Sequence, residues 1–278
     1  MNKRQIYYLL SPKLRRLVRR MYYFPIDLYE KISHKRDDIT PPKGKIFIGP
    51  GDFLKIGEKL KNDFIQYGGL LPHHYVLDIG CGIGRIAIPL TKYLNSNSKY
   101  EGIDIVKEGI DWCQKKINPK YPNFNFTHID LQNDLYNLET QNKASEFKFH
   151  FPDSSFDFII LTSVFTHMQE ADVINYLGEI SRLLKKGGKC FVTFFIIDEH
   201  AKSFLNSSSK PFFPFEFDHY YLHNEKVKDA NIAYKSDYIF PLISSKGLEI
   251  KFHHKGWWCG NDKNNCVDFQ DVLILEKI

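Results

Sequence analysis

An acid and three evenly spaced glycines form the part of this 278-residue sequence that is best suited to chemistry. The stretch VLDIGCGIGR, residues 76–85, sets Asp78 at the end of an apolar run and then Gly80, Gly82 and Gly84 at alternate positions. Glycine lets the backbone turn sharply, and a helix that begins near the third glycine offers free N–H groups and a positive dipole end. The pattern therefore predicts a strand, a turn and a helix around a nucleotide-like ligand.

The spacing of the glycines argues against a dinucleotide. The dinucleotide fingerprint G-x-G-x-x-G, counted from Gly80, needs a glycine at position 85, where this chain has Arg85. Asp78 also stands two residues before the first glycine, where its carboxylate would repel a pyrophosphate but could hold a cationic amino group. The ligand that this turn favours has a positive end and no phosphate.

The stretch resembles the first motif of the class I S-adenosylmethionine-dependent methyltransferases, an acid followed by alternating glycines. Three further segments occur in the order of that family: YEGIDI contains Asp104, FNFTHID ends in Asp130, and FDFIILTSVFTHM supplies a fourth strand with the loop after it. The resemblance implies that Asp104 binds the ribose hydroxyls of the cofactor. It also implies that Asp130 lies near the adenine amino group.

The cofactor implied by this resemblance is S-adenosyl-L-methionine, with S-adenosyl-L-homocysteine as its product and no metal. The residues that the resemblance assigns to cofactor binding are Asp78, Gly80, Cys81, Gly82, Arg85, Asp104, Ile105, Asp130, Leu131 and Ser163.

A parallel sheet would bring these residues together at one edge. Strands are predicted near residues 75–79, 99–104, 124–129, 157–162 and 188–196, separated by helical stretches. The clearest helix is EADVINYLGEISRLLKKGG, residues 170–188, with Lys185, Lys186 and Gly187 expected at its C-terminus. Residues 247–278 predict two last strands in a hairpin. The expected fold is a Rossmann-like, doubly wound α/β fold with a seven-stranded sheet whose last strand is antiparallel.

Two additions to this fold are expected. Residues 1–45 form a basic helical N-terminal extension, and residues 46–278 form the methyltransferase domain, in which residues 198–240 are a lid insertion on the acceptor side. The insertion is Ser-rich and then aromatic, and most of its aromatic side chains are expected to pack on the core. Its lid candidates are Phe212, Phe213, Phe215, Phe217, Tyr220 and Tyr221. Trp257 and Trp258, nearer the C-terminus, either face the acceptor or cover the sheet end.

The segment IGPGDF before the first strand has two readings. Gly51, Asp52 and Phe53 could close over the cofactor and substrate, as the equivalent segment of related methyltransferases often does. Asp52 could instead simply cap the helix that follows. The sequence leaves both open.

Charge is unevenly distributed along the chain. Residues 1–36 hold ten Lys or Arg against Asp27 and Glu30, a net charge of +8, whereas the remainder has a net charge of −3. Within this arm Leu14, Leu17 and Val18 recur at helical spacing. Basic amphipathic helices can lie on anionic membranes or on nucleic acid. We expect this helix to dock on its own domain through its Leu and Tyr side chains, with peripheral membrane contact as the alternative.

Composition is that of a cytoplasmic enzyme. Hydrophobic residues make up 43% of the chain, enough for a large core, and no apolar run approaches the roughly 20 residues that a membrane-spanning helix needs. No signal-peptide pattern is recognised at the N-terminus. The five cysteines contain no C-x-x-C pair, which favours a reducing compartment.

His167 is the candidate catalytic residue. Methyl transfer from a sulfonium requires alignment of the acceptor with the methyl group and, for a hydroxyl acceptor, removal of a proton. His167 lies in the loop after the fourth strand, where several similar O-methyltransferases carry a histidine general base. The alternative is that His167 caps the following helix.

The acceptor is expected to be a small-molecule or glycan hydroxyl. Enzymes that methylate exocyclic amines of DNA bases carry Asn or Asp, two prolines and an aromatic residue after this strand, whereas this chain has LTSVFTHM, so no nucleic-acid acceptor is expected. A second hypothesis is a non-catalytic cofactor-binding or regulatory module, anchored through its basic arm.

Overall fold

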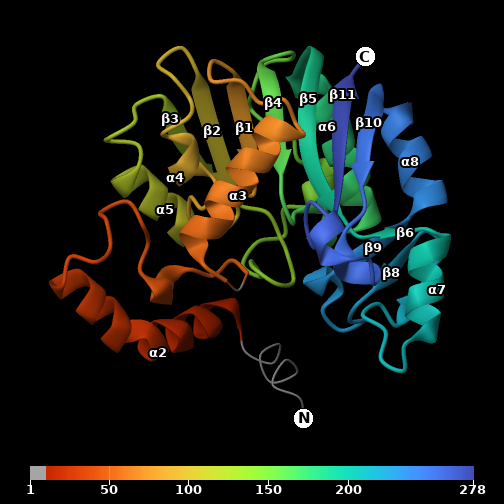
Figure 1. Ribbon diagram of the computed structural model, residues 1–278, viewed down its shortest axis with the longest axis horizontal. Coiled ribbons are helices and arrows are strands. Elements are labelled where there is room, and N and C mark those ends of the chain that lie inside the picture. Colours follow the sequence, from red (N-terminus) through yellow and green to blue (C-terminus); the bar gives the residue numbers. More distant parts are fainter. Residues whose placement is uncertain (1–10, 50) are drawn as a thin grey trace.

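A seven-stranded sheet runs through the middle of the computed structural model, which describes residues 11–49 and 51–278 (Figure 1). The strand order is β10-β11-β5-β4-β1-β2-β3. Pairing is parallel from β3 through β2, β1 and β4 to β5, and β11 is antiparallel to both of its neighbours. The predicted Rossmann-like sheet with an antiparallel last strand is confirmed. Its strands are β1 (Tyr75–Ile79), β2 (Lys99–Asp104), β3 (Phe124–His128), β4 (Phe156–Leu161), β5 (Leu184–Phe194), β10 (Leu248–His254) and β11 (Asp271–Lys277).

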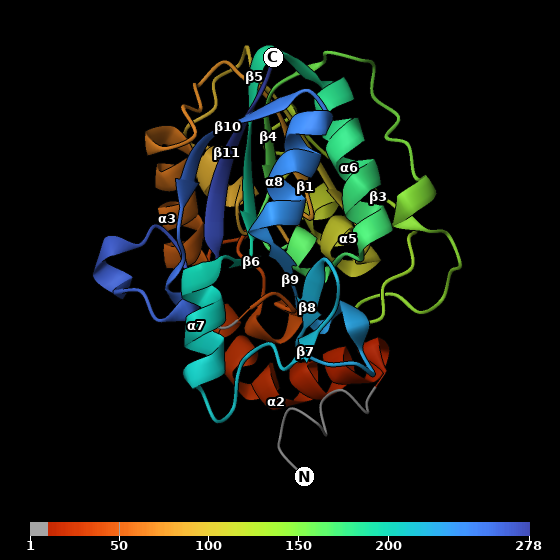
Figure 2. The same ribbon diagram turned by 90° about the vertical axis from the view of Figure 1, so that its right-hand side faces the viewer.

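Helices cover both faces of this sheet, because successive side chains of a strand point to opposite sides. Val76 of β1 packs into a core with α3 (Phe53–Gln66), α4 (Ala87–Leu90) and α5 (Lys107–Lys116). Its neighbour Leu77 packs into the core with α6 (Glu170–Leu183) and α8 (Ser236–Ser245). Figure 2 shows α3 and α6 on opposite sides of the sheet.

The helix predicted over residues 170–188 is too long at its C-terminal end. α6 ends at Leu183, and Leu184 already has extended dihedral angles and pairs with Phe156 of β4. Lys185 and Lys186 therefore belong to β5, which absorbs the extra residues in a register shift opposite Phe156 and Phe158. Pairing with β4 is the tertiary interaction that ends the helix early.

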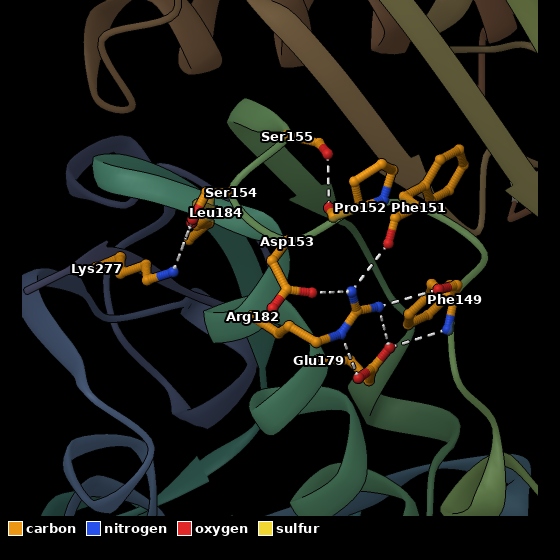
Figure 3. Close-up of polar contacts among 10 residues, drawn as sticks. All are labelled: Phe149, Phe151, Pro152, Asp153, Ser154, Ser155, Glu179, Arg182, Leu184 and Lys277. Atoms are coloured by element: carbon orange, nitrogen blue, oxygen red, sulfur yellow. Dashed lines mark hydrogen bonds and ion pairs between the residues drawn. The ribbon is translucent and has the colours of Figure 1, made fainter.

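The crossover between β3 and β4 is held by a side chain of α6 rather than by a long helix of its own. Within residues 129–155 the helical element is the short 3₁₀ helix η2 (Ala144–Glu146). Figure 3 shows the guanidinium of Arg182 donating to the carbonyl oxygens of Phe149 and Phe151, both at 2.9 Å, and to the carboxylate of Asp153 at 2.7 Å. Glu179 accepts two further bonds from Arg182, at 2.7 and 2.8 Å, and one from the Phe149 N–H. This network fixes the loop that leads into β4.

Residues 196–235, which overlap the insertion predicted over residues 198–240, form a small second layer beside the carboxyl ends of the main strands. It contains α7 (Glu199–Ser207) and a four-stranded sheet of order β6-β9-β8-β7, built from β6 (Ile196–Ile197), β7 (Phe215–Glu216), β8 (Tyr220–Leu222) and β9 (Ile232–Lys235) (Figure 1). Residues 236–240 of the predicted range belong instead to α8. Phe213 and Tyr221 are buried here together with Trp258, whose indole N–H donates to Asp271 at 2.7 Å. Trp258 thus covers the end of the sheet.

The N-terminal helix α2 (Pro12–Ile32) lies below the carboxyl ends of the strands in Figure 1 and docks through polar side chains. Asp27 accepts the N–H groups of Lys43 and Gly44 at 2.7 and 2.9 Å, and Arg15 is buried and donates to the Leu135 carbonyl. The apolar residues point away from the body, since Leu17 is 51% exposed and Met21 70% exposed. The expectation that α2 docks through its leucines is wrong, because backbone donors and carbonyls on the body select the charged face.

Two further expectations can be compared with the described residues. Asp52 caps α3 by accepting the N–H groups of Leu54 and Lys55 at 3.1 and 3.0 Å, as the simpler reading of that segment predicts. All five cysteines are free thiols. Among the described residues, no helix combines the length and the apolar character needed to span a membrane.

Candidate functional site

A cavity of about 430 Å³ lies at the carboxyl ends of the parallel strands, within the size range of small-molecule sites. It is next to the point where the strand order reverses between β1 and β4, the usual ligand position in open α/β sheets. Its floor comes from the ends of β1 and β2, and its remaining walls come from the segment before α3, the loop after β3, the loop after β4, α6, and the chain around β5 and β11.

The glycine turn forms the floor and is shaped by close packing. Gly80, Gly82 and Gly84 all have positive φ angles, of 83, 61 and 86°, in the region that favours glycine. A Cβ atom on Gly80 would lie 2.5 Å from Val164 of the loop after β4. The N–H groups of Gly80 and Cys81 donate to the Ile103 carbonyl at 2.8 and 3.1 Å, so the predicted free N–H cradle is not present there. The turn instead fastens β1 to β2.

Asp104 combines contact with this turn and access to the cavity. Its two carboxylate oxygens accept the N–H groups of Gly82 and Val106, both at 2.7 Å. Burial raises the pKa of Asp104 to about 6, although these backbone bonds favour the charged form. Each oxygen retains a lone pair for a further donor, so Asp104 can accept hydroxyl groups of a ligand in the cavity.

Asp78 lies behind the cavity wall and is fully buried. Its Oδ2 accepts the Tyr100 hydroxyl at 2.5 Å, and its Oδ1 has no hydrogen-bond partner among the described residues. Burial raises the pKa of Asp78 to about 7 against the effect of the Tyr100 bond. The charge of Arg85 favours the ionised form of Asp78 and that of Asp104 disfavours it. That Asp78 holds the positive end of a ligand stays a prediction.

Arg85 lines the cavity, and the acids Asp268 and Asp78 of the described chain act on it through their charge. Its Nε is buried without a hydrogen-bond partner among the same residues. Burial lowers the pKa of Arg85, whereas the charge of Asp268 acts in the opposite direction. A guanidinium in such surroundings is suited to a ligand carboxylate, which it can bind through paired N–H donors.

The other residues assigned to the cofactor divide into two groups. Ile105, Leu131 and Ser163 line the cavity, as Cys81 does. Asp130 does not: it is exposed and its Oδ1 accepts a bond from the Asn137 side chain at 2.9 Å. The loop after β3 turns its carboxylate outward, and the apolar side chains of its neighbours on both sides reach the cavity instead.

His167 stands in the 3₁₀ helix η3 (Phe165–His167) and lines the cavity. Its Nδ1 lies 2.7 Å from the Asp229 carbonyl oxygen, which can only accept, so this nitrogen carries the proton in the neutral ring and Nε2 carries the lone pair. Burial lowers the pKa of His167, offset in part by this backbone bond. The alternative that His167 caps α6 is wrong, because the N-cap residue is Gln169, whose N–H is bound by Asp172.

A cluster of polar side chains surrounds the end of β4. Ser163 has a positive φ of 56°, its N–H donates to the Thr193 hydroxyl at 2.7 Å, and its own hydroxyl donates to Gln270 at 3.0 Å. Thr193 also donates to the Gln270 side-chain oxygen at 2.7 Å. Gln270 lines the cavity, and its oxygen is occupied by the two hydroxyls. Its amide group is thereby oriented by Thr193 of β5 and by Ser163 of the loop after β4.

Several residues of the site escaped the sequence reasoning. Phe47, Ile48 and Gly49 line the cavity. They lie a few residues before Gly51, Asp52 and Phe53, for which closure over the cofactor was one of two readings. No sequence motif marks Gln270 or Asp229 as site residues, because only the tertiary fold brings the Gln270 side chain and the Asp229 carbonyl oxygen to the site. Of the predicted lid aromatics, Phe212 lines the cavity.

These features fit S-adenosylmethionine. Asp104, with its unused lone pairs, would accept the ribose hydroxyls, and Arg85 would bind the methionine carboxylate. Ile105 and Leu131 supply apolar surface for a flat base. The described residues contain no group of three or more His, Cys, Asp or Glu that could hold a metal ion.

Sequence comparisons point to the same class. Residues 76–188 match a family described as a methyltransferase domain. A tRNA N(3)-cytidine methyltransferase of Gallus gallus is 26% identical over 139 residues, which cover 47% of this chain and 33% of that protein. A 2-phytyl-1,4-naphtoquinone methyltransferase of Nostoc is 23% identical over 143 residues, covering 51% of this chain and 56% of that protein. The chain thus matches about a third to just over half of the length of these two relatives.

Solved structures share the fold. A Pyrococcus horikoshii protein superposes with a TM-score of 0.54 at 16% identity, covering 90% of this chain and 98% of the other. The magnesium protoporphyrin IX methyltransferase of Synechocystis, solved with bound S-adenosylhomocysteine, gives 0.51 at 15% identity, covering 83% and 90%. The glycine turn, the strand order and the domain match agree: residues 76–188 match a methyltransferase domain, and the chain has the fold of the S-adenosylmethionine-dependent methyltransferases.

Proposed function

We propose that this protein transfers a methyl group from S-adenosylmethionine to a hydroxyl group of a small molecule or glycan, with His167 as general base. The observation that carries the proposal is the tautomer imposed on His167. A carbonyl oxygen at Nδ1 leaves the lone pair on Nε2, and the residue lines the same cavity as Asp104 and Arg85.

The cofactor would supply a methyl group already activated by the positive sulfonium. The chain itself would bind and orient: Asp104 through the ribose hydroxyls, Arg85 through the carboxylate, and Gly80 with Cys81 through close backbone approach. The assignment of Asp78, Gly82 and Asp130 to the cofactor stays a prediction, since they do not line the cavity. Asp78 would act through its charge.

His167 would accept the hydroxyl proton as the acceptor oxygen forms its bond to the methyl carbon. Because burial lowers its pKa below the ordinary value, the ring is neutral and able to accept a proton at neutral pH. Asp229 would position the ring through its backbone carbonyl, and Asn133 would steady the same turn by donating to the His167 carbonyl at 3.1 Å.

The acceptor side of the cavity would be the aromatic wall of Phe195, Phe212 and Phe269. The matched relatives have acceptors as different as a tRNA cytidine and a naphthoquinone, so they do not select one for this chain. A small hydroxyl compound is favoured here by LTSVFTHM after β4, in place of the proline-containing motif of base-amine methylation. In this proposal residues 1–45 are an extension, residues 46–278 the methyltransferase domain, and residues 198–240 its acceptor-side insertion.

A second candidate is a cofactor-binding module without turnover, anchored through its basic arm. The observation in its favour is the exposed face of α2, which has no catalytic use. Incubating the protein with labelled S-adenosylmethionine and cell extract separates the two, because only an enzyme yields a labelled product. If no component of the extract becomes labelled although the protein binds S-adenosylhomocysteine tightly, the non-catalytic module is favoured.

The role of His167 is tested with the acceptor that this screen identifies. His167→Ala should lower turnover by ~10²–10⁴ while leaving cofactor affinity nearly unchanged. The matched control is His150→Ala, an exposed histidine outside the cavity lining. Near-parental turnover of a folded His167→Ala protein would mean that alignment alone drives the reaction.

A further inference from the structure

The outward side of α2 is a continuous apolar surface. Seven residues form what we call the apolar face of α2, and all are at least 42% exposed: Leu14, Leu17, Val18, Met21, Phe24, Leu28 and Ile32. They recur every three or four residues along the helix and lie within one side of it, with no charged residue among them. A 21-residue helix is about 31 Å long. Exposed apolar surface of this extent marks an interaction site.

Specific polar contacts fix this orientation. Arg16 and Arg20 both pair with Glu108 of α5, and Glu30 pairs with Lys43 at 2.6 Å. Together with the bonds of Asp27 to the 43–44 backbone, these contacts hold the charged side of the helix on the body. Rotating the helix to bury its leucines would break them, so the apolar face is turned outward by the fold itself.

The charges on α2 indicate what covers this face. Residues 11–36 contain eight Lys or Arg against Asp27 and Glu30, and both acids are turned toward the body. Lys13 and Lys31 lie exposed along one border of the apolar face, Lys13 in an ion pair with Glu139 at 2.5 Å, and Tyr22 and Tyr29 lie along the other border. A second copy of α2 would bring the same basic residues to this border and no outward-facing acid, so the two helices would repel each other there. An anionic surface would complement it.

We propose that α2 lies in the interface of an anionic lipid bilayer, with its apolar face among the acyl chains. A helix with an apolar face, basic borders and interfacial aromatic residues binds lipid in this way, to a depth of about 5–10 Å. The helix is joined to two walls of the cavity: η1 (Lys43–Lys45), on which it docks, leads into Phe47, and Arg15 holds the Leu135 carbonyl in the loop after β3. Binding of α2 to the bilayer would therefore place the cavity next to the membrane surface.

Sedimentation of the full-length protein with vesicles tests this. We expect the protein to pellet with phosphatidylcholine–phosphatidylglycerol vesicles, to pellet much less with phosphatidylcholine alone, and to be released by salt. Leu17→Asp and Met21→Asp should each lower the partition coefficient roughly tenfold or more, because each removes an apolar side chain that would be buried among the acyl chains of the bilayer. Lys31→Gln should lower it about fivefold. Leu71→Asp is the matched control, since Leu71 is 46% exposed but precedes β1 at the opposite edge of the sheet.

Several results would overturn the proposal. These are no pelleting with either vesicle, equal pelleting of the parent and the Asp variants, or pelleting that ignores phosphatidylglycerol. Self-association that the Asp variants abolish, without vesicle binding, would assign the face to a second copy. Circular dichroism and S-adenosylhomocysteine affinity confirm that each variant is folded. Since the assay needs no acceptor, a failure of the proposed catalysis leaves its result unaffected.

Discussion

Protonation of Asp104 should weaken cofactor binding between pH 7 and pH 5. Both carboxylate oxygens already accept backbone N–H groups, so the ribose hydroxyls must use the remaining lone pairs of the charged form. Burial raises the pKa of Asp104 to about 6. With that value the ionised fraction falls from about nine tenths at pH 7 to about one tenth at pH 5. The apparent Kd should therefore rise about tenfold, which is about 1.4 kcal/mol.

Titration calorimetry with S-adenosylhomocysteine across this pH range measures the effect. Asp104→Asn keeps the shape of the side chain but cannot ionise, and its amide must offer N–H donors where the backbone of Gly82 or Val106 also donates. This variant should bind roughly 1.5–3 kcal/mol more weakly at pH 7 and should lose the step near pH 6. Asp78, with a pKa raised to about 7, contributes a separate step that Asp78→Asn removes.

The reasoning would be refuted by a parent protein whose affinity is flat from pH 7 to pH 5, or by an Asp104→Asn variant that binds as tightly as the parent. Circular dichroism at each pH ensures that the compared proteins are folded. A step that persists in Asp104→Asn but disappears in Asp78→Asn would transfer the effect to the deeper acid.

Three further changes test the framework of the site. Arg182→Ala removes five hydrogen bonds and leaves Glu179 partly buried without its cation, so the free energy of unfolding should fall by roughly 2–4 kcal/mol in urea denaturation. Gly80→Ala should cost roughly 1–3 kcal/mol in the same assay, because φ is positive and the new Cβ would lie 2.5 Å from Val164. Asp78→Asn should stabilise the cofactor-free protein at pH 8 by up to roughly 4 kcal/mol, and this gain should vanish below about pH 4. The reason is that the pKa of this carboxyl rises from 3.8 to about 7 on folding, so its ionisation costs the protein stability progressively as pH rises from about 4 to about 7.

Each of these changes has a matched control. Lys277→Ala removes two bonds beside the Arg182 network, at 2.8 Å to the Leu184 carbonyl and at 3.5 Å to the Ser154 hydroxyl, and should cost less than about 1 kcal/mol (Figure 3). Gly178→Ala, on α6 with open space around its Cβ position, should stabilise by about 0.5–1 kcal/mol. Equal losses in Arg182→Ala and Lys277→Ala, or in the two glycine variants, would contradict the reasoning. So would an Asp78→Asn stability difference that does not change with pH.

The order of elements was determined by local sequence. Apolar runs that end in Asp78, Asp104 and Leu161 mark strands by composition alone, and a parallel sheet brings their carboxyl ends to one edge whatever the details of packing. The glycines are also determined locally, because positive φ angles exclude most other residues. For this reason the fold and the floor of the cavity could be predicted.

The tertiary structure decided which way side chains point and where elements end. Pairing of Leu184 with Phe156 ended α6 before its predicted cap, and the loop after β3 turned Asp130 outward. Periodicity shows that α2 has an apolar and a charged face but not which one meets the body. That choice depended on donors and acceptors at Lys43 and Leu135, remote in sequence from their partners in α2. The same holds for the tautomer of His167, because the carbonyl oxygen that sets it comes from a residue 62 positions away.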